Sequence, residues 1–409
     1  IDLKWIFLVV RRGKPFERSY RICHPKIDLV PVPVLSSFST PFLITFDNRF
    51  RYGCNIKLQE NAILIDSTKC NNPEAPYELV KTMRASFYVL GPLLSRFGFA
   101  KVSMPGGCAW GPRPIDYHLT AFETLGAKIT LDSGYIETKG KLSGNKIVFP
   151  KPSVGATGNV IMACMNLEED VFIVNASKEP EIVDLCNFIS MMGVTIEGIG
   201  TDNIHIKGTN ANQLQNIDYE IIPDRIEAGT YMIACAMCGG EITLNNINVN
   251  HLDVVVDKLI QSGCDIEIGK NQLKIISDAN INPVDVVTDV YPGYPTDLQA
   301  QWIALMSVAN GVSHVTDTIY NDRFTHVSEL VRLGASIRMD SNIAIINGVD
   351  KLKGAEVMST DIRASASLII AAMSASKTTV LSRIYHIDRG YEQIENKLSL
   401  IGAKIKRVN

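Results

Sequence analysis

One segment of the sequence combines a thiol with nearby cationic side chains and has a composition that excludes regular structure. Cys108 precedes Arg113 by five residues and His118 by ten, and three glycines and three prolines lie between positions 105 and 114. Neighbouring cations lower the pKa of a thiol and raise its reactivity. The segment therefore predicts a shaped loop that carries a reactive cysteine. A turn with an incidental cysteine is the alternative.

A second group of polar residues stands where helices are predicted to begin. Lys151-Pro-Ser-Val154, Thr296-Asp297 and Asp361-Ile-Arg363 each precede an apolar run of helical character. The first turn of a helix presents free backbone amides and the positive end of the helix dipole. We therefore expect these helix starts to face a multiply anionic ligand. At such a position Asp297 is interpreted as a helix N-cap, which is compatible with a functional role.

The elements that position these residues follow from an internal repeat. A five-residue pattern occurs six times: a small or apolar residue, Gly, a small residue, any residue and Ile. The glycines of successive copies are 73, 67, 70, 71 and 68 residues apart. A fixed period of this kind indicates a repeat architecture. The six glycines are Gly53, Gly126, Gly193, Gly263, Gly334 and Gly402.

Each repeat predicts a helix, a glycine stop and a strand pair. Val327, Leu330 and Leu333 form an apolar stripe at helical spacing before their glycine, whereas Ile204-His-Ile206 alternates with period two after one. The glycine suits the left-handed residue that ends a helix. The copy around Gly53 is the weakest, because no convincing helix precedes it. Three repeats per domain predict α/β domains at 1–222 and 223–409.

Composition excludes several classes of protein. The net charge of −3 over 409 residues does not favour nucleic acid or a membrane surface as a partner. The apolar stretch from Trp5 to Val10 is too short to span a bilayer. Nine cysteines without metal-ligand spacing predict a reducing, cytoplasmic environment and no bound metal. The oligomeric state is not predicted.

The cysteine loop resembles a known active-site loop. Pro-Gly-Gly-Cys108-x-x-Gly-x-Arg113-Pro-x-Asp116-x-His118 is similar to the loop of the UDP-N-acetylglucosamine enolpyruvyl transferase family. Further blocks resemble the family in order along residues 52 to 409. They are Ala75–Ser86, Ser153–Thr157, Glu179–Asp184, Pro223–Glu227, Pro295–Gln301, Asp361–Ser367 and Tyr385–Glu392.

The resemblance implies a fold and a reaction. The fold is two inside-out α/β domains, each of three βαβαββ units, in which residues 1–22 form a hairpin that pairs with the second domain. The reaction moves the enolpyruvyl group of phosphoenolpyruvate onto the 3′-hydroxyl of UDP-N-acetylglucosamine and releases phosphate, as the first committed step of peptidoglycan synthesis. No metal or organic cofactor is implied.

The resemblance also implies roles for individual residues. Cys108 matches the proton donor, which can form a covalent adduct with phosphoenolpyruvate, and Asp297 matches the carboxylate that takes the proton of the 3′-hydroxyl. Arg389 and Lys26 match residues at the phosphoenolpyruvate site, as does Arg113, because an arginine fork binds carboxylate and phosphate. The implied substrate-binding residues are Arg84, Arg113, Pro114, Ile115, Asp116, Tyr117, Lys151, Pro152, Ser153, Val154, Thr296, Ile319 and Arg363. A structural ion pair is the alternative for Arg363.

The sequence departs from the family pattern mainly in residues 1 to 52. Ile27 stands where the family has an asparagine next to its lysine, and Pro25 removes a backbone amide. A smaller change is Asn321-Asp-Arg323-Phe, where Glu-Asn-Arg-Phe is usual. Two rival hypotheses stay open. One is a decayed copy that binds the UDP-sugar without efficient turnover. The other is a shikimate 3-phosphate enzyme, which the Cys108 loop disfavours.

The loop predicts selective chemical labelling. An epoxide phosphonate should alkylate wild-type protein once, and Cys108→Ser should abolish this, because a serine hydroxyl is a far weaker nucleophile than a thiolate. Intact-mass spectrometry measures the adduct, and Cys238→Ser serves as the control that keeps it. Labelling that persists in Cys108→Ser would place the reactive thiol elsewhere.

Overall fold

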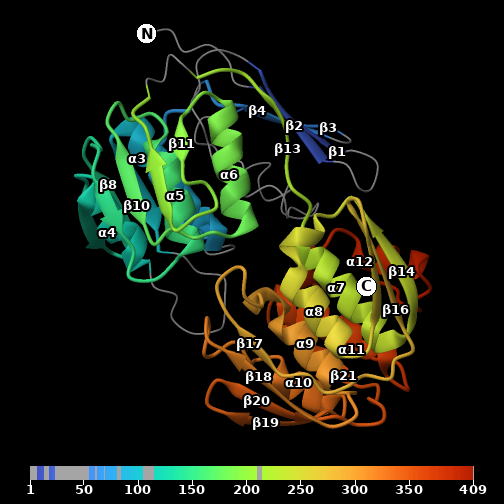
Figure 1. Cartoon of the computed structure of the whole chain (residues 1–409). Coiled ribbons are helices and arrows are strands. Elements are labelled where there is room, and N and C mark those ends of the chain that lie inside the picture. The colour runs from blue at the N-terminus through green and yellow to red at the C-terminus, as the bar shows by residue number, and fades with distance from the viewer. Residues whose placement is uncertain are drawn as a thin grey trace. The chain divides into compact units, whose positions relative to one another are not determined.

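The computed structural model describes residues 7–12, 18–23, 55–59, 62–68, 70–80, 84–104, 115–209 and 214–408. These residues divide into two compact units, one ending at Ile222 and the other beginning at Pro223 (Figure 1). Within the described ranges, no helix is long and apolar enough to cross a membrane.

Two sheets of the first unit have the same plan. In each, one parallel strand pair is extended by antiparallel strands, in the orders β5-β6-β8-β7 and β11-β12-β10-β9. The strands are β5 (Glu74–Ala75), β6 (Phe99–Ser103), β7 (Lys128–Asp132), β8 (Tyr135–Lys139), β9 (Lys146–Val148), β10 (Val171–Val174), β11 (Ile196–Glu197) and β12 (Asn203–Ile206). The helices are α2 (Tyr77–Val80), η2 (Arg84–Val89), α3 (Leu90–Phe97), α4 (Asp116–Thr124), α5 (Val154–Cys164) and α6 (Pro180–Met191).

Helix α5 lies in the core of this unit and is buried from Ala156 to Cys164. Its one amide side chain, Asn159, is fully buried but satisfied: it accepts from Gly91 N at 2.9 Å and donates to Phe87 O at 3.2 Å. This contact requires a glycine, because a Cβ on Gly91 would lie 2.5 Å from the Asn159 carbonyl oxygen. The apolar run of the sequence is thus a helix enclosed on most sides.

The N-terminal hairpin belongs to a third sheet of the first unit. Strands β1 (Phe7–Arg12) and β2 (Arg18–Cys23) belong to a sheet of order β13-β2-β1-β4-β3, with β3 (Asn55–Gln59), β4 (Ala62–Asp66) and β13 (Asp218–Glu220). All of these strands belong to the first unit. Strand β1 pairs with β4, and β2 pairs with β13. The expected pairing of residues 1–22 with the second domain stays a prediction.

The second unit contains three sheets. Their orders are β14-β16-β15, β17-β18-β20-β19 and β21-β22. The strands are β14 (Gly240–Asn245), β15 (Asp265–Gly269), β16 (Gln272–Ser277), β17 (Val286–Thr288), β18 (Val312–Asp317), β19 (Ser336–Asp340), β20 (Ile343–Asn347), β21 (Glu356–Met358) and β22 (Val380–Ser382). The helices are α7 (Arg225–Cys238), η4 (Val249–His251), α8 (Asp253–Gln261), η5 (Thr296–Leu298), α9 (Gln299–Met306), α10 (Val327–Arg332), α11 (Ile362–Ser374), η6 (Ile384–Arg389) and α12 (Ile394–Leu400).

Helices α7, α9 and α11 pack together in the middle of this unit, with sheets on the outside (Figure 1). All eight residues of α9 are buried, including Gln299 and Gln301. An ordinary surface helix would have a polar face. The arrangement is therefore inside-out, as expected from the sequence.

The glycine stops are confirmed. Gly126, Gly193, Gly263, Gly334 and Gly402 all have positive φ, between 93° and 108°. At the first of these, Ala127 N donates back to Phe122 O at 2.9 Å, so the turn satisfies a carbonyl that the helix end would otherwise leave free. Gly53 lies outside the described residues.

The buried His326 of the second unit has a lowered pKa. His326, the N-cap residue of α10, is 2% exposed. Burial disfavours its charged form and, although the carboxylate of Asp361 opposes this, lowers the pKa of His326 from 6.5 to about 4. The unfolded chain therefore binds a proton between these two pH values that the folded protein does not bind.

The stability of the folded protein should decrease as the pH falls from 6.5 towards 4. The free energy of unfolding is expected to fall by up to about 1.4 kcal/mol per pH unit from this residue as the pH drops from 6.5 towards 4. His326→Phe, which does not titrate, should reduce the slope measured by urea unfolding. The control is His314→Gln, at an exposed histidine. An equal slope in His326→Phe and wild type would contradict the assignment.

Candidate functional site

The carboxylate of Asp297 lies between two arginines of the second unit. Asp297 belongs to η5, immediately before α9, and its side chain is 41% exposed. Its Oδ1 lies 2.6 Å from Arg323 Nη2, and its Oδ2 lies 3.4 Å from Arg363 Nη2. The arginines are much less exposed, at 6% and 18%. The cluster therefore presents an accessible carboxylate anchored from behind by buried cations.

This geometry keeps Asp297 ionised. Partial burial opposes ionisation, but the positive charges of Arg363 and Arg323 outweigh it and hold the pKa of Asp297 well below its usual range. The same attraction raises the pKa of Arg363 despite burial of that side chain. At neutral pH the carboxylate is an acceptor of hydrogen bonds only. The N-cap residue of α9 is Leu298, which makes no side-chain cap hydrogen bond, and the Asp297 carboxylate accepts from Arg323 and Arg363.

Arg363 is placed by the start of α11. Asp361 caps this helix, and its Oδ1 accepts from Arg363 N at 2.8 Å and from Ala364 N at 3.1 Å. The Arg363 guanidinium donates from Nη1 to the Tyr391 hydroxyl at 3.3 Å. Arg363 therefore forms an ion pair, and its partner is the candidate catalytic carboxylate of Asp297.

A buried hydroxyl network supports Arg363 from the side of the core. Thr230 Oγ1 on α7 donates to Ile226 O at 2.8 Å, so it accepts from the Tyr391 hydroxyl at 2.8 Å and from Gln301 Nε2 at 3.1 Å. Tyr391 is 1% exposed. Helices α7, α9 and α11 are thus joined through polar side chains directly behind the carboxylate.

Thr296 and Ile319 lie on the same side of this unit. The Thr296 hydroxyl accepts from Arg323 Nη1 at 2.9 Å and donates to Asp317 Oδ2 at 2.7 Å. The backbone N–H of Ile319 donates to Asp317 Oδ1 at 2.9 Å. The structure therefore brings together Thr296, Asp297, Ile319 and Arg363 of the predicted site.

Arg389 is the last residue of the short helix η6, and the residue before it, Asp388, forms an ion pair with Arg407. Arg407 donates to both oxygens of Asp388, at 2.8 and 2.5 Å. The same guanidinium donates to Glu395 on α12 at 3.0 Å. The segment that carries Arg389 is thus held by a bidentate pair.

In the first unit, two helix starts carry the remaining described candidates. Ile115 is buried just before α4, whereas Asp116 is exposed as its first residue, and the Tyr117 ring stacks on Phe149 at 6.2 Å. Ser153 caps α5 by accepting from Ala156 N at 3.3 Å. Lys151 and Val154 are exposed and Pro152 half-buried. The predicted helix start is thus capped by Ser153, and the first-turn amides of α5 follow it.

His118 does not have the cationic role expected beside the thiol. Its ring is 7% exposed and lies edge-on to Phe87. The hydrogen bonds of Asn159 to Gly91 N and Phe87 O fix the amide orientation, so Asn159 Nδ2 donates to His118 Nδ1 at 3.1 Å. A ring nitrogen that accepts a hydrogen bond carries no proton. His118 is therefore a neutral core residue in this arrangement.

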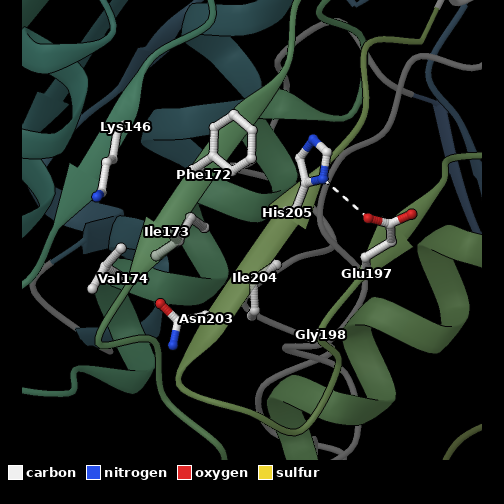
Figure 2. A pocket seen from close by; sticks show the side chains of 9 residues that line it. All are labelled: Lys146, Phe172, Ile173, Val174, Glu197, Gly198, Asn203, Ile204 and His205. Atoms are coloured by element: carbon white, nitrogen blue, oxygen red, sulfur yellow. Dashed lines mark hydrogen bonds and ion pairs between the residues drawn. The ribbon is translucent and has the colours of Figure 1, made fainter.

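A cavity of about 450 Å³ lies on the sheet of β9 to β12 (Figure 2). The rings of Phe172 and His205 stack there with centroids 4.2 Å apart, and His205 lies between the carboxylates of Asp170 and Glu197. None of its lining residues is a predicted site residue.

In the part of the chain that the structure describes, no cluster of His, Cys, Asp and Glu could hold a metal ion.

Several predicted residues cannot be placed. Cys108, Arg113, Pro114 and Lys26 lie outside the described residues, and only the backbone of Arg84, in η2, is described. Sequence reasoning missed Arg323 and Tyr391 as members of the site. Both stand within motifs that were recognised, but nothing in their spacing indicates that they lie beside Asp297 and Arg363.

Comparison with known proteins identifies the family. Residues 52–398 match the model of the family EPSP synthase (3-phosphoshikimate 1-carboxyvinyltransferase). A UDP-N-acetylglucosamine 1-carboxyvinyltransferase of Chlorobium chlorochromatii is 51% identical over 358 residues, 87% of this chain and 84% of the relative. One from Caldanaerobacter subterraneus is 44% identical over 411 residues, 98% of this chain and 99% of the relative.

Solved structures support the fold. The enolpyruvyl transferase NikO from Streptomyces tendae has a TM-score of 0.80 at 21% identity, covering 98% of both chains. An EPSP synthase from Acinetobacter baumannii has a TM-score of 0.65 at 15% identity, covering 98% of this chain and 100% of that one. Because the family model spans most of the chain and the curated relatives are similar along nearly all of it, this chain belongs to the carboxyvinyltransferase family of EPSP synthase and, within it, to the UDP-N-acetylglucosamine 1-carboxyvinyltransferases.

Proposed function

We propose that the protein transfers the enolpyruvyl group of phosphoenolpyruvate to the 3′-hydroxyl of UDP-N-acetylglucosamine and releases phosphate. The names of the relatives support this substrate pair, and the anchored, ionised carboxylate of Asp297 is the structural observation that carries it. The reaction serves peptidoglycan synthesis in the cytoplasm. The free thiols at Cys70, Cys164, Cys186, Cys235, Cys238 and Cys264 are consistent with a reducing compartment.

The chemistry needs one proton removed and one delivered. The 3′-oxygen bonds to C2 of phosphoenolpyruvate as its proton passes to Asp297, while Cys108 delivers a proton to C3. The tetrahedral intermediate then loses a C3 proton to the Cys108 thiolate, and its C2–O bond to phosphate breaks as the leaving phosphate takes the proton from Asp297, which restores the alkene and both side chains. Cys108 can also form a covalent adduct, in which Sγ bonds to C2 of phosphoenolpyruvate and the thiol proton is added at C3.

The arginines adjust the basicity of Asp297. While Arg323 and Arg363 both hold the carboxylate, it is a weak base, suited to accepting a hydrogen bond from the hydroxyl. A bound phosphate or carboxylate attracts the same guanidinium groups and so raises the proton affinity of Asp297. Arg389 and Lys26 bind phosphoenolpyruvate with Arg113. The starts of α4 and α5 bind the UDP-sugar together with Arg84, Thr296, Ile319 and Arg363.

The alternative substrate is shikimate 3-phosphate, because the description of the family model names 3-phosphoshikimate. The relatives at 44% and 51% identity carry the UDP-sugar name along most of the chain. We therefore expect phosphate release with UDP-N-acetylglucosamine and none with shikimate 3-phosphate. The reverse preference would overturn the proposed substrate.

Turnover should depend on Asp297. Asp297→Asn is expected to lower kcat by about 10²-fold or more, the usual effect of removing a general base, measured as phosphate release with both substrates saturating. Asp340→Asn, at an exposed carboxylate of the same unit, is the matched control and should retain wild-type kcat. Wild-type protein that binds the UDP-sugar but releases no phosphate above background would favour the decayed copy. Equal kcat for Asp297→Asn and wild type would instead remove Asp297 from the mechanism.

A further inference from the structure

A buried carboxylate that the proposed chemistry does not use lies next to the site. Asp317, the last residue of β18, is 0% exposed. It stands opposite Thr288, the last residue of the parallel strand β17. Ligand sites commonly form at the carboxyl ends of parallel strands. Because burying a charge is unfavourable unless it is paired or hydrogen-bonded, the partners of Asp317 show how it is stabilised.

Every recorded partner of the Asp317 carboxylate is a donor. Oδ1 accepts from Thr288 Oγ1 and from the backbone N–H of Ile319 and Tyr320, each at 2.9 Å. Oδ2 accepts from Thr296 Oγ1 at 2.7 Å. The carboxylate therefore joins the end of β17, the turn after β18 and the segment that contains Asp297.

The direction of the Thr296 hydrogen bonds is fixed from both ends. Arg323 has donors only, so the Thr296 oxygen must accept from Arg323 Nη1 at 2.9 Å. The Thr296 proton then points to Asp317, which accepts only. Arg323 Nη2 in turn donates to Asp297 Oδ1 at 2.6 Å. A single chain of hydrogen bonds thus runs from Asp317 through Thr296 and Arg323 to Asp297.

We propose that Asp317 is a positioning residue for the Asp297 carboxylate, acting through the Thr296 hydroxyl and the Arg323 guanidinium. By accepting the hydrogen bond of the Thr296 hydroxyl, Asp317 keeps a lone pair of the Thr296 oxygen directed at Arg323, which holds that guanidinium against the Asp297 carboxylate. The catalytic consequence rests on the proposed function, whereas the placement of Arg323 does not.

Two variants distinguish this chain of hydrogen bonds (the relay) from a purely structural role of Asp317. In Asp317→Asn, the amide oxygen still accepts from the turn, but the amide nitrogen donates to Thr296 and releases the hydroxyl proton to rotate. Thr296→Val removes the relay without a change of charge, and it carries the test even where Asp317→Asn fails to fold. Asp184→Asn is the control, because Asp184 is also buried and accepts from the Tyr219 hydroxyl at 2.6 Å, in the other unit.

Two readouts test the relay. Asp317→Asn and Thr296→Val should each lower kcat about tenfold, with KM for both substrates changed less than about twofold in Asp317→Asn. The double variant should be no slower than either single variant, because both break one chain. Asp184→Asn should retain wild-type kcat. Losses that multiply in the double variant, or a wild-type kcat in Thr296→Val, would overturn the proposal.

The second readout needs no turnover. The Arg323 guanidinium ¹⁵N signals, assigned with Arg323→Lys, should show restricted Nη rotation in wild type and faster rotation in Asp317→Asn and Thr296→Val. Thr296→Ser should restore the restriction. Unchanged Arg323 signals in Thr296→Val would reject the relay. If wild type releases no phosphate, the proposed function fails, and these signals alone decide the positioning role.

Discussion

The meeting of two arginines with one carboxylate organises the second unit. Asp297 contacts Arg323 and Arg363, which reach it from the segment before α10 and from the start of α11. The arginines are largely buried, so each needs the negative charge that Asp297 contributes. Removal of the carboxylate would leave two buried cations without their partner. The proposed catalytic position and a structural requirement therefore coincide in this side chain.

The inside-out packing explains why so many polar groups lie behind this cluster. A helix buried on all sides must satisfy any polar side chain within the protein. Thr230 Oγ1 accepts from Gln301 Nε2 and from the Tyr391 hydroxyl, which in turn accepts from Arg363. Asn159 does the same in the first unit with η2 and α3. Buried helices thus acquire fixed neighbours, and their N-terminal residues acquire defined positions.

The directions of the hydrogen bonds extend this fixed arrangement from the core to the carboxylate of Asp297. Arginine only donates and an ionised carboxylate only accepts, so the hydroxyl of Thr296 between them has one permitted orientation. A comparable constraint makes His118 neutral, because Asn159 must donate to it. In both cases the protonation pattern follows from neighbours on other segments.

The sequence by itself determined the repeats, the glycine stops and the family, because these depend on local chemistry and on spacing along the chain. The positive φ of Gly126 and the cap at Ser153 are local features of this kind. Only the tertiary structure decided that Arg323 faces Asp297, that β1 and β2 pair with β4 and β13, and that His118 is buried. These contacts join residues 26 to 201 positions apart, and no local pattern specifies which distant residues meet.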